Sequence, residues 1–156
     1  MQSARALLES RIRRLVDLVP TVEDDELRAE LTKHLCVLCS GLLEVSCRDI
    51  IARYAAPRCD KTVLRFVDTR LADLQSARVG NMHQLLACFD PGRADTWRDA
   101  LSDEERDSVD SIVNNRHQIA HGRSIGLSFD VLNGYLERAR KALGLMERQF
   151  PNHKGA

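Results

Sequence analysis

The chain of 156 residues has few aromatic side chains, no excess of charge of either sign and no long hydrophobic run. Phe, Trp and Tyr make up 4% of the residues, which excludes a broad aromatic platform for stacking single-stranded nucleic acid. The 23 basic and 23 acidic residues give a formal net charge of zero. Any nucleic acid must therefore be bound by a local cleft, because the chain as a whole creates no positive field.

The beginning of the chain lacks the continuous apolar core of an export signal, because residues 1–20 alternate Arg with apolar side chains. No apolar run approaches the ~20 residues that a membrane span needs. We therefore expect a cytoplasmic protein without a membrane partner. Five cysteines, an odd number, agree with this expectation, since disulfides are rare in the cytosol.

Cys36 and Cys39 have the CxxC spacing of metal and redox sites. They lie inside a helical apolar run, however, and not at the turns where such sites are found. We expect both side chains to pack in the core as small hydrophobic groups, and we expect no bound metal or other cofactor.

Helical periodicity runs through almost the whole sequence, and no strand pattern interrupts it. An N-terminal helix is predicted over 4–19, main helices over 24–55, 60–79, 102–121 and 128–150, and shorter ones over 81–89 and 94–101. The second helix is apolar on nearly all sides from residue 35 to 51, which is typical of the centre of a bundle. The predicted fold class is all-α, an antiparallel helical bundle of four main helices plus short helices.

The predicted domain organisation is one domain over residues 1–156, a length that suffices to bury a core without disulfides. Its core spans about residues 27–150, preceded by an N-terminal helix over 1–20 and followed by a polar tail over 151–156.

Most of the chemistry is concentrated in residues 116–121, Arg-His-Gln-Ile-Ala-His, which Gly122 follows. Ser102 and Glu105 predict a capping box at the start of this helix, and Gly122 predicts its end. A basic helix end is stabilised by the dipole by only about 0.3–1 kcal/mol, so the charge pattern alone carries little functional information.

Helical register places Arg116 in the middle of an apolar stripe. The stripe consists of Val109, Ile112, Val113 and Ala120. An ionised side chain in such a position requires an anion, because burying an unpaired charge is costly. His117 and His121 are four residues apart and lie close together on the flank. Arg116 and His121 diverge by about 140° on a straight helix. Either the last turn unwinds, or the cleft is built from two copies of the motif.

An Arg separated by four residues from a His, on a late helix of a small all-helical chain, resembles the HEPN superfamily. Many members of that superfamily are metal-independent endoribonucleases. The stretch 113–122, VNNRHQIAHG, is most similar to the HEPN domains named for ribonuclease L and prokaryotic stress proteins. Glu44, midway along the apolar second helix, matches the acid that the family often carries there. The resemblance covers roughly residues 27–150.

The resemblance implies an RNA substrate that is cleaved by attack of its own 2′-hydroxyl, without metal. A histidine exchanges protons near neutral pH, and an arginine stays charged and binds phosphate bidentately. The implied catalytic residues are His121 for proton transfer and Arg116 for the scissile phosphate. His117 is implied in a supporting role, orienting either the phosphate or His121. Arg123 is either an extension of the phosphate-binding surface or a solvated residue after the helix.

Several alternatives remain open at this level. Glu44 is either the anion that pairs with Arg116 or a carboxylate that faces solvent. The family resemblance implies a homodimer with a composite cleft. The first function hypothesis is an endoribonuclease that acts as a toxin or antiviral effector and is restrained by an antitoxin or another regulatory protein. The alternative function is a catalytically silent helical module for dimerisation or nucleotide binding.

Overall fold

The computed structural model describes residues 3–152, in which every regular element is helical. The elements in chain order are α1 (Ala4–Leu18), the short 3-10 helix η1 (Val19–Thr21), α2 (Asp25–Ala55), α3 (Lys61–Ala72), α4 (Val79–Ala87), α5 (Pro91–Ala100), α6 (Asp103–Ala120) and α7 (Phe129–Gln149). The predicted all-α fold class is confirmed. Within residues 3–152, no helix is both long enough and apolar enough to cross a membrane.

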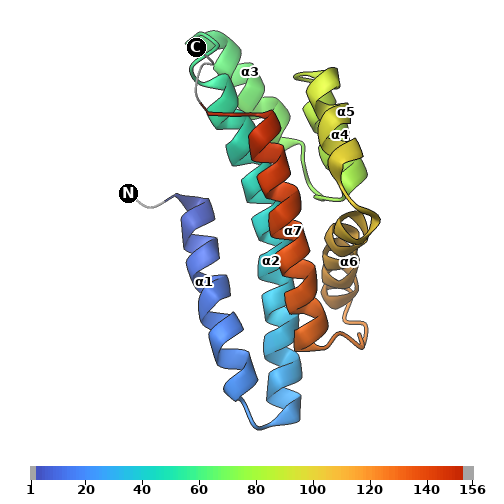
Figure 1. Ribbon diagram of the computed structural model, residues 1–156. Helices are drawn as coiled ribbons and strands as arrows, with labels where there is room; N and C mark the ends of the chain where they lie inside the picture. Colours follow the sequence, from blue (N-terminus) through green and yellow to red (C-terminus); the bar gives the residue numbers. More distant parts are fainter. Residues whose placement is uncertain (1–2, 153–156) are drawn as a thin grey trace.

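Helices α2 and α7 lie side by side along the centre of the bundle (Figure 1). Helix α1 packs against α2, and α6 packs against both α7 and α2. α1 runs antiparallel to α2, as predicted for the bundle, whereas α7 runs in the same direction as α2 (Figure 1). Helices α4 and α5 pack against each other, and α4 also contacts α6. Four helices, α3 to α6, separate the two central helices in sequence.

The core is built around α2, which has 31 residues and is buried on most of its circumference. Cys36, Cys39 and Cys47 are among its buried side chains, and all five cysteines of the described chain are free. Burial raises the pKa of each of these three thiols to about 12. They are therefore protonated core residues, and the expectation that Cys36 and Cys39 pack as hydrophobic groups is confirmed.

The helix predicted over 60–79 is wrong beyond residue 72. Helix α3 ends at Ala72, a connector follows, and α4 begins at Val79, so Gly80 lies inside the first turn of α4 instead of after a helix. The apolar periodicity continues through Leu74, which is buried. The sequence pattern therefore gave no indication that the helix ends at Ala72.

Two side chains from other helices hold this connector, residues 73–78, in its non-helical path. The Arg48 guanidinium of α2 donates to the carbonyl oxygens of Leu71, at 3.1 Å, and of Leu74. A continuing helix would have used these oxygens itself. At the other end, the Asp110 carboxylate of α6 accepts a 2.9 Å hydrogen bond from the backbone N–H of Val79.

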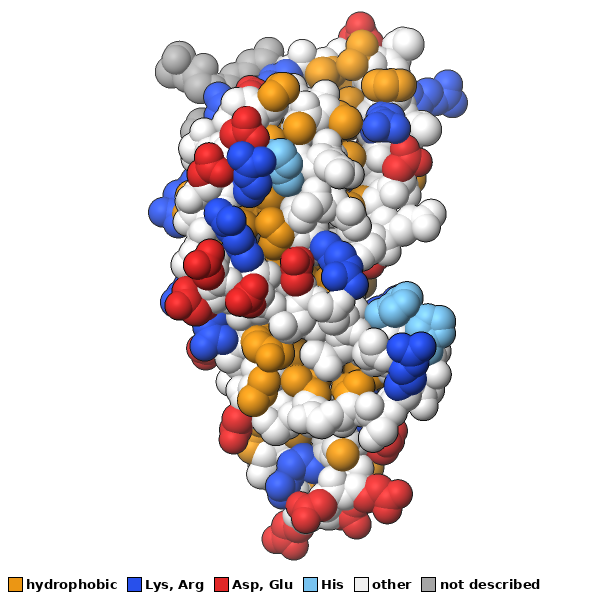
Figure 2. All heavy atoms as spheres, turned by 90° about the vertical axis from the view of Figure 1, so that its right-hand side faces the viewer, with side chains coloured by type: hydrophobic (Ala, Val, Ile, Leu, Met, Phe, Trp, Pro, Cys, Tyr) orange, Lys and Arg blue, Asp and Glu red, His pale blue; other side chains and the backbone are white. Residues whose placement is uncertain are grey.

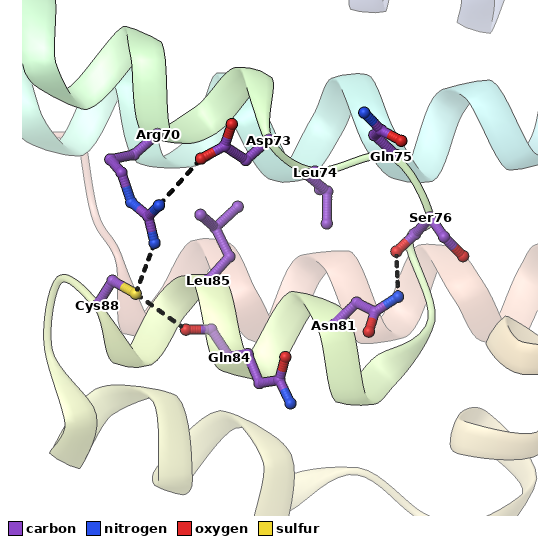
Figure 3. A pocket seen from close by; sticks show the side chains of 9 residues that line it. All are labelled: Arg70, Asp73, Leu74, Gln75, Ser76, Asn81, Gln84, Leu85 and Cys88. Carbon is purple, nitrogen blue, oxygen red and sulfur yellow. Dashed lines mark hydrogen bonds and ion pairs between the residues drawn. The ribbon is translucent and has the colours of Figure 1, made fainter.

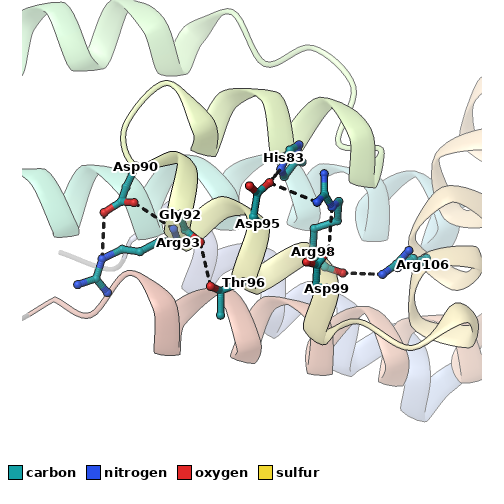
Figure 4. A network of polar contacts seen from close by, with 9 residues as sticks. All are labelled: His83, Asp90, Gly92, Arg93, Asp95, Thr96, Arg98, Asp99 and Arg106. Carbon is teal, nitrogen blue, oxygen red and sulfur yellow. Dashed lines mark hydrogen bonds and ion pairs between the residues drawn. The ribbon is translucent and has the colours of Figure 1, made fainter.

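Polar contacts join α4, α5 and α6 into one unit (Figure 4). His83 of α4 lies 2.8 Å from the Asp95 carboxylate of α5, which also pairs with Arg98 at 3.3 Å. Arg106 of α6 donates to the Arg98 carbonyl oxygen at 2.8 Å. Trp97 is fully buried and donates its indole N–H to the Ala142 carbonyl of α7 at 3.0 Å. The unit is thereby fixed against the centre of the bundle.

Candidate functional site

The motif helix α6 begins and ends where its sequence predicts. Ser102 and Glu105 form the reciprocal capping box at its start, with hydrogen bonds of 3.0 and 3.1 Å. At its end Gly122 has φ +65°, in the left-handed region. The Gly122 N–H binds the Ile119 carbonyl and the Arg123 N–H binds the Gln118 carbonyl, both at 3.0 Å, which is the Schellman arrangement. The last turn therefore does not unwind before Gly122.

The two motif histidines meet on the surface of α6. The Nε2 atoms of His117 and His121 are 3.2 Å apart, and the ring centroids are 4.5 Å apart with the rings at 73°. Both side chains are exposed. At this distance the two rings form a hydrogen bond, in which one Nε2 donates and the other accepts. The predicted proximity of the two histidines is confirmed.

A cavity of about 300 Å³, here called the motif cleft, lies beside this pair of histidines. It is formed by α2, the 73–78 connector and α6. Its lining residues are Ser40, Glu44, Gln75, Ser76, Arg78, Val113, Arg116 and His117. Figure 2 shows two His side chains next to each other on this side of the molecule, with Lys or Arg side chains nearby.

Arg116 is exposed, so its predicted position within a buried apolar stripe is wrong. Val109, Ile112 and Val113 are buried as predicted, but Ala120 is exposed, because the burial of this face ends with Val113. Arg116 therefore lies in water at the margin of the motif cleft and does not require a buried anion. Its side chain forms no hydrogen bond or ion pair within residues 3–152.

Glu44 faces the same cleft from α2 and is half-buried. Burial raises the pKa of its carboxyl group, while the positive charges of Arg48 and, less strongly, Arg116 lower it. No ion pair joins Glu44 to Arg116 in the described chain. The structure thus brings Glu44 and Arg116 to one cleft without an ion pair between them.

Arg78 is the cleft residue that the sequence did not reveal. It precedes α4, lines the motif cleft opposite α6, and its half-buried side chain has no bonded partner among residues 3–152. Sequence periodicity placed it inside a continuous helix and therefore gave no local signal for it. The contacts of Arg48 and Asp110 with the connector help to place Arg78 at the cleft that Arg116 also lines.

His121 and Arg123 lie outside the lining of the motif cleft. His121 contacts the cleft only through His117, which does line it. The Arg123 guanidinium donates to the Gln118 side-chain oxygen at 2.9 Å, so this residue folds back on its own helix. Within residues 3–152, no three His, Cys, Asp or Glu side chains gather as a metal-binding group.

Comparison with protein families gives a match to RiboL-PSP-HEPN over residues 6–148. The match begins within α1 and so includes the N-terminal helix that lay outside the predicted core. No curated protein and no solved structure matches the chain.

Proposed function

The chain belongs to the RiboL-PSP-HEPN family, whose domains are typically of the ribonuclease type, and on that premise we propose that it is a metal-independent endoribonuclease. One observation carries the proposal. The two arginines of the motif cleft, Arg78 and Arg116, have no bonded partner within the described chain and lie beside a pair of hydrogen-bonded histidines. Free guanidinium groups in a cleft attract a phosphate, and imidazoles transfer protons near neutral pH.

In the proposed reaction, Arg116 and Arg78 bind the scissile phosphate and stabilise the charge that develops on its oxygens. The histidine pair takes the proton of the 2′-hydroxyl, whose oxygen forms the new bond to phosphorus. The bond from phosphorus to the 5′-oxygen breaks, and a histidine returns a proton to this leaving oxygen. The products are a 2′,3′-cyclic phosphate and a 5′-hydroxyl end, with no net consumption of protons.

His121 is the proposed proton-transfer residue and His117 its partner. Because His117 lines the motif cleft and His121 does not, a proton reaches His121 through the 3.2 Å contact or from a second chain. The continuous last turn of α6 favours a second chain, since one straight helix directs Arg116 and His121 apart. We therefore propose a homodimer in which the motifs of two chains form one composite cleft.

The Glu44 carboxylate, in this proposal, keeps Arg116 directed into the cleft while leaving its guanidinium free to bind phosphate. A nuclease of this kind would damage cellular RNA if unrestrained. A role as a toxin or antiviral effector, held in check by an antitoxin or another regulatory protein, completes the proposal.

The deciding experiment is incubation of the purified protein with RNA in EDTA. Wild type is expected to produce 2′,3′-cyclic phosphate ends. His121→Ala is expected to lower the cleavage rate by about 100-fold or more, the usual loss when an acid–base group is removed. Arg116→Ala is expected to lower it to a similar extent, because the charge that develops on the phosphate oxygens is no longer stabilised. Arg78→Ala lowers it by at least about tenfold, because a charged hydrogen bond to phosphate is lost. Arg148→Ala, at an exposed arginine of α7 away from the cleft, is the matched control.

Mixing the inactive Arg116→Ala and His121→Ala chains tests the composite cleft. A mixed dimer restores one site that has both residues, so part of the activity returns if the cleft spans two chains. Absence of recovery in dimers shown to have mixed would contradict the shared site. Wild-type protein that is folded but cuts none of a diverse set of RNAs would instead support the catalytically silent module.

A further inference from the structure

A second cavity, of about 520 Å³, lies between α3 and α4 next to the motif cleft (Figure 3). Gln75 and Ser76 of the connector line both cavities, so the two are adjoining compartments. The volume is within the range of small-molecule sites, about 300–1,000 Å³. This compartment is called the α3–α4 cavity below.

Charge distinguishes the two compartments. In the α3–α4 cavity the Arg70 guanidinium is paired with the Asp73 carboxylate at 3.0 Å, so its charge is neutralised within the cavity wall. In the motif cleft, Arg78 and Arg116 have no bonded partner among the described residues. A phosphate is therefore favoured in the motif cleft, and a neutral group is favoured in the α3–α4 cavity.

The lining of the α3–α4 cavity suits a flat heterocycle. Leu74 and Leu85 lie between the two helices and form an apolar surface, with the Arg70 end on one side and the Ser76 end on the other (Figure 3). Asn81 donates to the Ser76 carbonyl at 3.0 Å, which leaves its side-chain oxygen available. The side-chain amide of Gln84 has no bonded partner within residues 3–152.

Amide and guanidinium side chains are the groups that pair with purine edges. Gln and Asn bind the N6 and N7 atoms of adenine bidentately, and Arg binds the O6 and N7 atoms of guanine. Single-stranded RNA is read in this way because its bases are free to turn outward into a pocket. Because Gln75 and Ser76 line both compartments, a base in the α3–α4 cavity and a phosphate in the motif cleft can belong to one strand.

We propose that the α3–α4 cavity binds a purine base of the RNA strand whose scissile phosphate lies in the motif cleft, and thereby sets the sequence preference of cleavage. This inference rests on the proposed nuclease function for its effect on cleavage. Binding of the base is measurable without any cleavage, so the two proposals can fail separately.

The first test measures binding of 2′-O-methyl oligonucleotides, which lack the attacking hydroxyl and cannot be cut. Wild type is expected to bind a uridine tract with one central purine at least about tenfold more tightly than a tract of uridines alone. Gln84→Ala reduces this preference to near unity without changing the affinity for uridine alone. Gln149→Ala, a glutamine of α7 that does not line the cavity, retains the preference. Equal binding of the two oligonucleotides by wild type would overturn the proposal.

The second test locates the base through Cys88, an exposed cysteine that lines the α3–α4 cavity. At an oligonucleotide concentration about ten times Kd, the purine-containing strand slows alkylation of Cys88 about tenfold, because only unbound protein reacts. Alkylation of Cys59, which does not line the cavity, is unchanged. Mass spectrometry reads both sites. Unprotected Cys88 in a saturated complex places the base elsewhere and refutes the proposal.

The two proposals give different combinations of results. Purine preference and Cys88 protection without cleavage in EDTA refute the nuclease and leave the base site standing. Cleavage without any purine preference supports the nuclease and removes the base site.

Discussion

Asp110 of α6 is predicted to couple the stability of the fold to the geometry of the motif cleft. Its carboxylate accepts a 2.9 Å hydrogen bond from Val79 at the start of α4, where Arg78 in the N-cap position supplies no side-chain cap. The same contact fixes the end of the connector that carries Arg78 into the cleft. Asp110→Ala therefore removes the cap of α4 from a neighbouring helix.

The expected cost follows from this geometry. Loss of a capping side chain destabilises by about 0.5–2 kcal/mol. Removal of a negative charge at a helix N-terminus costs about 0.3–1 kcal/mol. Part of this cost is already contained in the cost of losing the cap, so the two contributions do not add in full. We expect a total of about 1–2 kcal/mol, and at about 2–4 °C per kcal/mol for a chain of this size, a fall in Tm of about 2–8 °C. Asp110→Asn keeps an oxygen acceptor and is expected to lose only the charge contribution.

Urea unfolding measures the loss of stability, and cleavage of RNA in EDTA measures the effect on the cleft. With the connector released, Arg78 is displaced, and kcat/KM is expected to fall by about 10- to 100-fold. Asp107→Ala, at an exposed acid one turn earlier on α6, is the matched control for the change in charge. If Asp110→Ala and Asp107→Ala unfold alike and cleave alike, Asp110 neither caps α4 nor positions Arg78, and the reasoning is refuted.

Two further predictions concern the motif helix and the acid of α2. Gly122→Ala is expected to destabilise by about 1–2 kcal/mol, because φ is +65° there and a Cβ would meet no atom within 4 Å, so only backbone strain contributes. Gly126→Ala, equally open but without a positive φ, should be neutral in thermal unfolding, and equal effects of both would contradict this account. Glu44→Gln is expected to raise stability near neutral pH, because burial raises the pKa of the carboxyl group in the folded chain. A raised acid pKa means that the folded state binds more protons, so wild-type stability falls as pH rises through the folded pKa. The advantage of Gln should vanish below the ordinary pKa of 4.5, and unfolding curves at several pH values that show a constant difference would disprove it.

Local signals in the sequence were sufficient for the helices that became α1, α2, α6 and α7. The apolar periodicity of α2, the capping box at Ser102 and the glycine after His121 each act within a few residues, and the structure has these features where they were predicted. The pairing of His117 with His121 also follows from a local rule, because residues four apart are neighbours on a helix. The family resemblance rested on these same local features and is confirmed.

The predictions from sequence were wrong where a residue distant in sequence determined the local structure. The break after Ala72 depends on Arg48, which occupies carbonyl oxygens that a continuing helix would use. Arg116 is exposed although Val109, Ile112 and Val113 are buried, and helical register alone does not contain that information. The partner of Glu44 was sought on α6, whereas its strongest attraction is to Arg48 on its own helix.

The sequence by itself determined that this protein is an all-helical member of its family, with an arginine and two histidines at the end of one helix. Periodicity and capping specify such features because they depend on neighbours within a turn or two of the chain. Only the tertiary structure decided which groups share a cleft. Arg48 and Asp110 hold the 73–78 connector against α2 and α6, and this brings Arg78 beside Arg116 and opens the α3–α4 cavity next to them. These contacts join residues more than 20 positions apart, and no local rule specifies them.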